Sequence, residues 1–187
     1  MKAVGAMNQA ELAAYVHSQL RQEGIDLVLS GGAAVSIYTS NRYISRDVDF
    51  VATGLASRAE IKRAMERLGF RQVGRHYEHP DAKWFVEFPG GPPSVGTEPI
   101  AHIEEIHFAT GTLRVISATD CVKDRLSAYY HWHDRQSLEQ ALLVAAERDI
   151  DVGEVRRWSE VEGKLDEFAK IEHELSRNSL RKPPHSV

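Results

Sequence analysis

Two aspartates stand two positions apart in a segment, residues 47–51, whose side chains alternate between polar and apolar. Alternation with a period of two is typical of a half-buried strand, in which Asp47 and Asp49 share one face and Val48 and Phe50 share the other. Two close carboxylates repel each other unless protons or a cation relieve the charge, and Mg²⁺ suits a few carboxylate oxygens completed by substrate phosphates. The spacing therefore indicates a metal site, with a solvated acidic strand edge as the simpler alternative.

A glycine pair upstream of the aspartates offers a place for phosphate. Residues 27–29 are Leu-Val-Leu and predict a short strand, which runs through Ser30, Gly31 and Gly32 into a predicted helix over residues 33–38. Because glycine has no Cβ, the backbone N–H groups at the start of that helix can approach a phosphate, and the helix dipole favours its negative charge. An ordinary turn between strand and helix is the alternative.

A third carboxylate belongs to a later segment with strong strand propensity. Residues 84–88 are Trp-Phe-Val-Glu-Phe, and the run Pro-Gly-Gly-Pro-Pro at residues 89–93 ends the predicted strand. Glu87 then points away from the apolar face, where it could complete a metal site and accept a proton from an attacking hydroxyl. Glu87 is the preferred candidate for this third acid, and Glu104 and Glu105 compete with it.

The elements that must position these residues are helices at both ends of the chain and strands between them. Capping boxes predict helices that begin after Asn8 and after Ser57, since each is followed three residues later by Glu. Residues 102–108 and 112–116 predict a hairpin, and apolar stripes with helical spacing follow from Ser117 onward.

This order of elements predicts an α/β (α+β) fold whose C-terminal part is helical. We expect a core over residues 1–116, a helical region over residues 117–177 packed on that core, and a flexible tail over residues 178–187.

The amino-acid composition excludes some classes of protein. The chain has 187 residues, of which 27 are acidic and 23 are basic, so its formal charge is -4. This charge argues against binding of nucleic acid mainly by electrostatic attraction. Cys121 is the only cysteine, so an intramolecular disulfide is excluded and a reducing compartment is favoured. The sequence contains neither an apolar run of about 18 to 20 residues nor a signal-peptide pattern. We therefore expect a cytoplasmic protein with no membrane contact.

The order of these motifs resembles the signature of the nucleotidyltransferase superfamily. Gly31-Gly32, the strand Asp47-Val48-Asp49-Phe50 and an acid on a later strand carry the resemblance, which spans residues 25 to 148. Within the superfamily, the chain is most similar to small bacterial nucleotidyltransferase-like proteins related to AbiEii-type toxins of toxin–antitoxin systems. The stretch from Asp120 to Tyr130 resembles the basic helix that follows the sheet in those relatives.

The resemblance implies a mixed β-sheet flanked by helices, an activity, and a role for each residue. A nucleoside monophosphate would pass from an NTP such as ATP to an acceptor hydroxyl, with release of pyrophosphate and with two Mg²⁺ ions. Asp47, Asp49 and Glu87 would be the catalytic and metal-binding carboxylates. The nucleotide and its phosphates would contact a set of small and basic residues: Ser30, Gly31, Gly32, Arg46, Lys123 and Arg125. A solvated helix face is the alternative for Lys123 and Arg125.

The acceptor stays open at this stage. A macromolecule such as tRNA or a protein is one possibility, in which case the chain would be a toxin with an antitoxin partner. An aminoglycoside-type small molecule is the second. A catalytically silent nucleotidyltransferase-like binding module is the third, although two intact aspartates argue against it.

Overall fold

The computed structural model describes residues 2–100 and 102–180, which divide into two compact units. The sheet unit comprises residues 1–34, 44–93 and 103–116, and the helical unit comprises residues 35–43, 94–102 and 117–187. The predicted core over residues 1–116 and the predicted packing of residues 117–177 on that core stay predictions. Within the predicted tail, residues 178–180 belong to the last helix, and residues 181–187 lie outside the described residues.

The strands of the sheet unit form one mixed, seven-stranded sheet in the order β3-β4-β5-β2-β1-β9-β8. Strand β2 lies antiparallel to β1 and parallel to β5, while β1 lies parallel to β9. The predicted mixed sheet flanked by helices is confirmed. Its strands are β1 (Leu27–Ser30), β2 (Asp47–Ala52), β3 (Arg71–Val73), β4 (His76–Glu78), β5 (Phe85–Glu87), β8 (Ile103–Phe108) and β9 (Gly111–Ile116).

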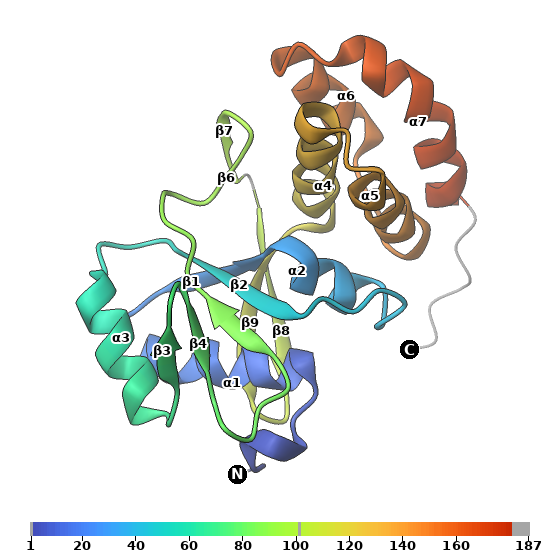
Figure 1. Cartoon of the computed structure of the whole chain (residues 1–187). Helices are drawn as coiled ribbons and strands as arrows, with labels where there is room; N and C mark the ends of the chain where they lie inside the picture. Colours follow the sequence, from blue (N-terminus) through green and yellow to red (C-terminus); the bar gives the residue numbers. More distant parts are fainter. Residues whose placement is uncertain (1, 101, 181–187) are drawn as a thin grey trace. The chain divides into compact units, whose positions relative to one another are not determined.

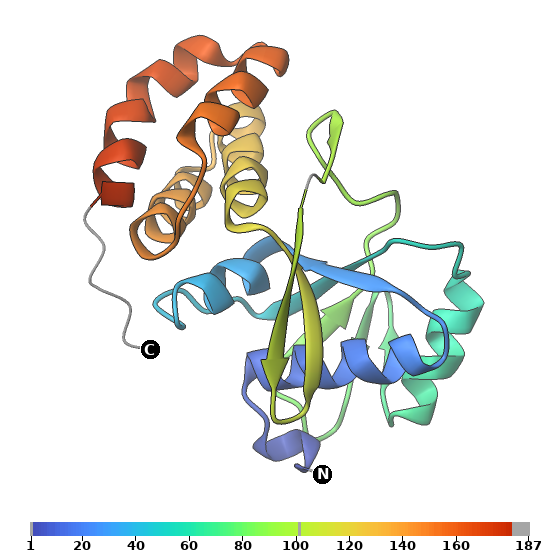
Figure 2. The ribbon, with the colours of Figure 1, turned by 180° about the vertical axis from the view of Figure 1, so that it is seen from behind.

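Two helices of this unit begin where the sequence predicts. Helix α1 (Gln9–Gln22) and helix α3 (Arg58–Arg67) each start with a complete capping box, at Asn8 and at Ser57. Helix α1 packs against β1 and β9 (Figure 2) and is preceded by a 3₁₀ turn, Val4–Ala6. Capping satisfies backbone N–H groups that would otherwise have no partner, so these starts follow from local chemistry.

The core of the sheet unit confirms the alternation predicted for β2. Val48, Phe50 and Val86 are fully buried, whereas Asp47 and Asp49 are half-buried on the other face. The predicted hairpin is also confirmed, with Phe108 opposite Gly111 at its turn. Strands β3 and β4 were not predicted, because three residues are too few for a period-2 pattern to show.

The helical unit packs four helices together, as Figure 1 shows, and Trp158 and Phe168 are fully buried among them. None of the helices in the described ranges is long and apolar enough to cross a bilayer. The helices are α4 (Ala118–Trp132), α5 (Arg135–Glu147), α6 (Val152–Val161) and α7 (Leu165–Leu180). A small two-stranded sheet belongs to the same unit, with strands β6 (Ser94–Val95) and β7 (Glu98–Pro99). Helix α2 (Gly31–Tyr38) links the units in sequence.

His17 makes the stability of the sheet unit depend on pH. Its ring is fully buried in α1, Nδ1 lies 2.7 Å from the carbonyl oxygen of Thr112, and Nε2 has no partner among the described residues. Burial lowers the pKa of His17. As the pH falls below about 6.5, the unfolded state therefore binds a proton that the folded state does not, and stability falls by up to about 1.4 kcal/mol per pH unit.

Urea denaturation at pH 5.5 and pH 7.5 should show this loss in the wild type and a smaller loss in His17→Gln. The exposed His173 provides the control, since His173→Gln should keep the wild-type pH dependence. Equal pH dependence in all three proteins would contradict a role for His17.

Candidate active site

Ser30, Asp49 and Glu87 lie side by side across three neighbouring strands. Ser30 of β1 is the register partner of Asp49 of β2, and Asp49 is the partner of Glu87 of β5. Register partners point to the same face of a sheet, and Asp47 joins them because it lies two residues from Asp49. The opposite face at this point consists of buried Val48 and Val86. The structure thus brings the predicted acidic residues to one half-exposed face.

Gly31 lies directly against the carboxylate of Asp49. Its φ is +65°, a conformation that side-chain-bearing residues rarely adopt, and a Cβ at this position would lie 2.5 Å from Oδ2 of Asp49. Two separate causes therefore require glycine here, the backbone angle and the close approach. Gly32 follows as a buried residue of the first turn of α2.

Asp47 is held by contacts that the sequence analysis did not anticipate. The Ser45 hydroxyl donates a hydrogen bond to Oδ1 of Asp47. The buried Gln9 donates from Nε2 to the carbonyl oxygens of Ser45 and Asp47, both at 3.1 Å. No periodicity or motif marks Gln9 or Ser45 in the sequence. The Gln9 contacts arise only when α1 meets the start of β2, whereas the Ser45 contact joins residues two positions apart.

Glu87 is the third acid that the sheet order places beside Asp49. Strand β8, which carries Glu104 and Glu105, is separated from β2 by β1 and β9. Oε2 of Glu87 lies 3.6 Å from Nε of Arg75, whose side chain is 88% exposed. An ion pair this exposed contributes little stability, so Glu87 can give up Arg75 at small cost.

The carboxylates offer part of a metal site. Among residues 2–100 and 102–180, no three His, Cys, Asp or Glu side chains are arranged to hold a metal ion by themselves. Mg²⁺ commonly takes one or two carboxylates and completes its shell with water and substrate phosphates. Asp47 and Asp49, on one strand face beside Ser30 and Gly31, are a donor set of this incomplete kind.

Arg46 directly precedes Asp47 and is exposed. Its carbonyl oxygen accepts a hydrogen bond of 3.4 Å from the backbone N–H of Phe85, which ties the start of β2 to β5. The predicted contact between its guanidinium and a phosphate stays a prediction.

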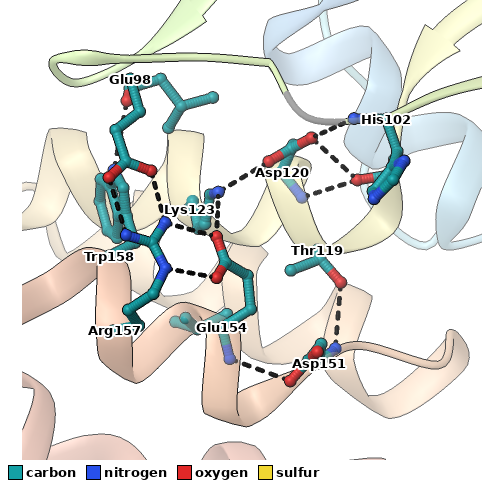
Figure 3. Close-up of polar contacts among 12 residues, drawn as sticks. Glu98, His102, Thr119, Asp120, Lys123, Asp151, Glu154, Arg157 and Trp158 are labelled. Atoms are coloured by element: carbon teal, nitrogen blue, oxygen red, sulfur yellow. Dashed lines mark hydrogen bonds and ion pairs between the residues drawn. The ribbon is translucent and has the colours of Figure 1, made fainter.

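Lys123 has surroundings that differ from both sequence-based interpretations. Its side chain is 1% exposed in the helical unit, so it is no solvated helix face, and Nζ lies 2.9 Å from Asp120 and 3.1 Å from Glu154. Figure 3 shows these contacts continuing through Arg157 to Glu98. Hydrogen bonds from Arg157 and then Lys123 outweigh burial and lower the pKa of Glu154 to about 2. The two carboxylates already compensate the charge of Lys123, and its predicted role in phosphate binding stays a prediction.

Arg125 also has partners in the helical unit. Its guanidinium pairs with Asp124 and lies 3.3 Å from Oε1 of Gln140. Burial alone would lower the pKa of Arg125. The Asp124 carboxylate outweighs burial and raises the pKa above its usual value, so the side chain stays charged. A role for Arg125 in phosphate binding stays a prediction.

Comparison with solved structures identifies the fold. A nucleotidyltransferase-like antigenic protein from Paracoccidioides brasiliensis superposes with a TM-score of 0.66 at 16% identity, over 95% of both chains. The antibiotic-resistance factor ANT(2'')-Ia superposes with a TM-score of 0.50 at 16% identity, over 85% of this chain and 92% of that one. A crystal structure of ANT(2'')-Ia with adenylyl-2''-tobramycin gives the same TM-score over 83% and 94% of the chains.

No known family profile and no curated protein sequence matches the chain. The structural likenesses show that it has the nucleotidyltransferase-like fold, which confirms the resemblance to the superfamily at the level of fold. The relation to AbiEii-type toxins stays a prediction.

Gly31→Ala should destabilise the protein more than Gly24→Ala. Both glycines have positive φ, +65° and +77°, but a Cβ at Gly24 would meet nothing within 4 Å. We expect about 1 to 2 kcal/mol of backbone strain for either variant and a further loss for Gly31→Ala from the collision with Asp49. Chemical denaturation gives both values. In an Asp49→Ala background the difference between the two variants should shrink, and a difference that persists there would show that Asp49 is not its cause.

Lys123→Met should lower the unfolding free energy by about 3 to 5 kcal/mol, because it leaves the buried carboxylate of Asp120 without its cation. Adding Asp120→Asn should restore part of the loss. The exposed Lys170 supplies the control, and Lys170→Met should stay near wild type in urea denaturation. A stable Lys123→Met protein with weakened nucleotide binding would contradict this structural role and support the predicted phosphate role.

Proposed function

We propose that the chain transfers a nucleoside monophosphate from an NTP to an acceptor hydroxyl. The observation that carries this proposal is the row of Ser30, Asp49 and Glu87 across β1, β2 and β5, with Gly31 packed against Asp49. The nucleotidyltransferase-like fold supports it.

The proposed reaction assigns a distinct task to each end of the row. The acceptor oxygen attacks the α-phosphorus of the NTP and forms a new P–O bond. The bond between that phosphorus and the oxygen bridging to the β-phosphate breaks, and pyrophosphate leaves with the bonding electron pair. The hydroxyl proton passes to the carboxylate of Glu87, which acts as general base once Arg75 has moved aside.

Ser30, Gly31 and Gly32 lie on the phosphate side of the proposed site. They stand at the start of α2, an eight-residue helix whose N-terminus favours negative charge. Asp47 and Asp49 would hold Mg²⁺, for which two ions are expected. When bound, these cations would neutralise charge on the reacting phosphates. Ser45 and Gln9 would keep the Asp47 end of the strand in place.

The acceptor has two candidate classes. The likeness to ANT(2'')-Ia, which was solved with adenylyl-2''-tobramycin, favours a small molecule. A macromolecular acceptor, tRNA or protein, with a toxin role and an antitoxin partner, rests on the resemblance of residues 120–130 to the AbiEii-type relatives. The ion pair between Glu87 and Arg75 is the observation that favours a catalytically silent binding module.

Mg²⁺ with ATP should stabilise the wild type far more than the Asp49→Asn variant. At a hundredfold excess over Kd the expected gain is about 2.7 kcal/mol, read as a rise in melting temperature. Mg²⁺ alone should do little, because the carboxylates are an incomplete shell without phosphate oxygens. Asp81, 71% exposed in the same unit, supplies the control, and Asp81→Asn should respond like the wild type.

Incubation with α-³²P-ATP, Mg²⁺ and a panel of total tRNA, cell lysate or aminoglycosides then identifies the acceptor by label transfer. Stabilisation by Mg²⁺-ATP without transfer to any acceptor would favour the silent module. Equal stabilisation of wild type and Asp49→Asn would refute the proposed metal site.

A further inference from the structure

A cleft with a volume of about 1040 Å³ lies within the sheet unit, and Glu87 is one of its lining residues. The first turn of α3, the turn between β3 and β4, and the loop at residues 89–93 form its walls. Its volume is slightly above the range of about 300 to 1,000 Å³ that is usual for small-molecule sites. The cleft therefore has room for a ligand next to the acid that we propose as general base.

Basic side chains outnumber acidic ones in the lining of the cleft, whereas acidic side chains outnumber basic ones in the whole chain. Arg58, Lys62 and Arg75 face a single carboxylate, Glu87, although the chain carries a net charge of -4. Nζ of Lys62 lies 3.9 Å from Glu66, a weak exposed contact within α3. Arg58 has no ion-pair partner in the part of the chain that the structure describes. This excess of positive charge is available to a ligand.

Arg58 is close to the wall formed by residues 89–93. A Cβ on Gly90 would lie 3.4 Å from Nη2 of Arg58, so the guanidinium reaches across from α3 to this loop. A guanidinium in such a place presents paired N–H donors, a geometry that matches phosphate oxygens.

We propose that this cleft binds the acceptor, and that the acceptor carries a phosphate group close to the hydroxyl that receives the nucleotide. This inference rests on the proposed nucleotidyltransferase function and deepens it by naming the acceptor class. A polycationic aminoglycoside would meet three like charges and one opposite charge there, whereas a phosphate would meet three opposite charges and one like charge, Glu87. A small sugar phosphate and the phosphodiester end of an RNA share this chemistry.

Arg75 links the cleft to the reacting carboxylate. It lines the cleft and pairs with Glu87 at 3.6 Å. A phosphate bound in the cleft competes with Glu87 for this guanidinium, because both are anions. Acceptor binding would thus free Glu87 to take the hydroxyl proton, which makes Arg75 a positioning residue that couples acceptor binding to activation of the base.

Two neighbouring residues of α3 give a matched test. Lys62 lines the cleft, whereas Arg63 is also exposed but lines a separate pocket with Glu23 and Arg67. Lys62→Glu and Arg63→Glu change the net charge by the same amount. Calorimetric titration with ribose 5-phosphate should show binding weakened at least about tenfold by Lys62→Glu and unchanged by Arg63→Glu. The melting temperatures of both variants establish that they are folded.

Titration of the wild type with an RNA trinucleotide and with tobramycin completes the binding test. The two phosphate-bearing probes distinguish the sources of the phosphate, and binding of either one that depends on Lys62 supports the proposal. Tobramycin binding that exceeds that of both phosphate probes would overturn it, as would equal effects of Lys62→Glu and Arg63→Glu. With α-³²P-ATP, label should pass to the phosphate-bearing probe that binds, and its transfer to tobramycin instead would also overturn the proposal.

Failure of the underlying function has a separate signature. If Mg²⁺-ATP does not stabilise the wild type, the nucleotidyltransferase proposal is refuted, and this result does not depend on the cleft. A wild type that binds Mg²⁺-ATP and passes label to an acceptor, with no dependence on Lys62, refutes the acceptor cleft alone.

Discussion

Burial of Val48 and Phe50 is the constraint on which the rest of the site depends. Both side chains are fully buried, so β2 has a fixed inner face and Asp47 and Asp49 must point the other way. A shift of one residue in register would bury both carboxylates and expose both apolar side chains. Because β1 and β5 pair with β2 on its two sides, the same burial also aligns Ser30 and Glu87 with Asp49.

Close approach of Gly31 to Asp49 adds a second, local constraint. The turn from β1 into α2 brings backbone so near the carboxylate that no Cβ fits without a shift. Residues that are required to be small for a reason outside their own element often mark a place where function limits sequence. The contact places the start of a helix next to an acid, which is the combination that a metal and a phosphate together need.

The balance of charged side chains differs from one region of this protein to another. The helical unit holds Lys123 with Asp120 and Glu154 in a network whose inner members are almost fully buried. The cleft near Glu87 carries three exposed cations in a chain that is acidic overall. A net charge of -4 therefore predicts neither the partner of Lys123 nor the ligand of the cleft, since electrostatic energy depends on distance and burial more than on the sum.

The sequence by itself determined the elements that have local causes. Capping boxes at Asn8 and Ser57, the alternation of residues 47–51, and the hairpin around Thr110 and Gly111 all appear in the structure. The shared face of Asp47 and Asp49 followed from the same alternation, because side-chain direction in a strand depends only on the parity of the position.

Only the tertiary structure decided what depends on strand order and packing. Glu87 rather than Glu104 or Glu105 lies beside Asp49, because β5 neighbours β2 while β8 does not. The contacts of Gln9 with the backbone of Ser45 and Asp47 join elements far apart in the chain. Lys123 looks like a solvent-exposed or phosphate-binding lysine in the sequence and is buried in the structure. A helix has several faces, and only its neighbours determine which of them is covered and by which charges.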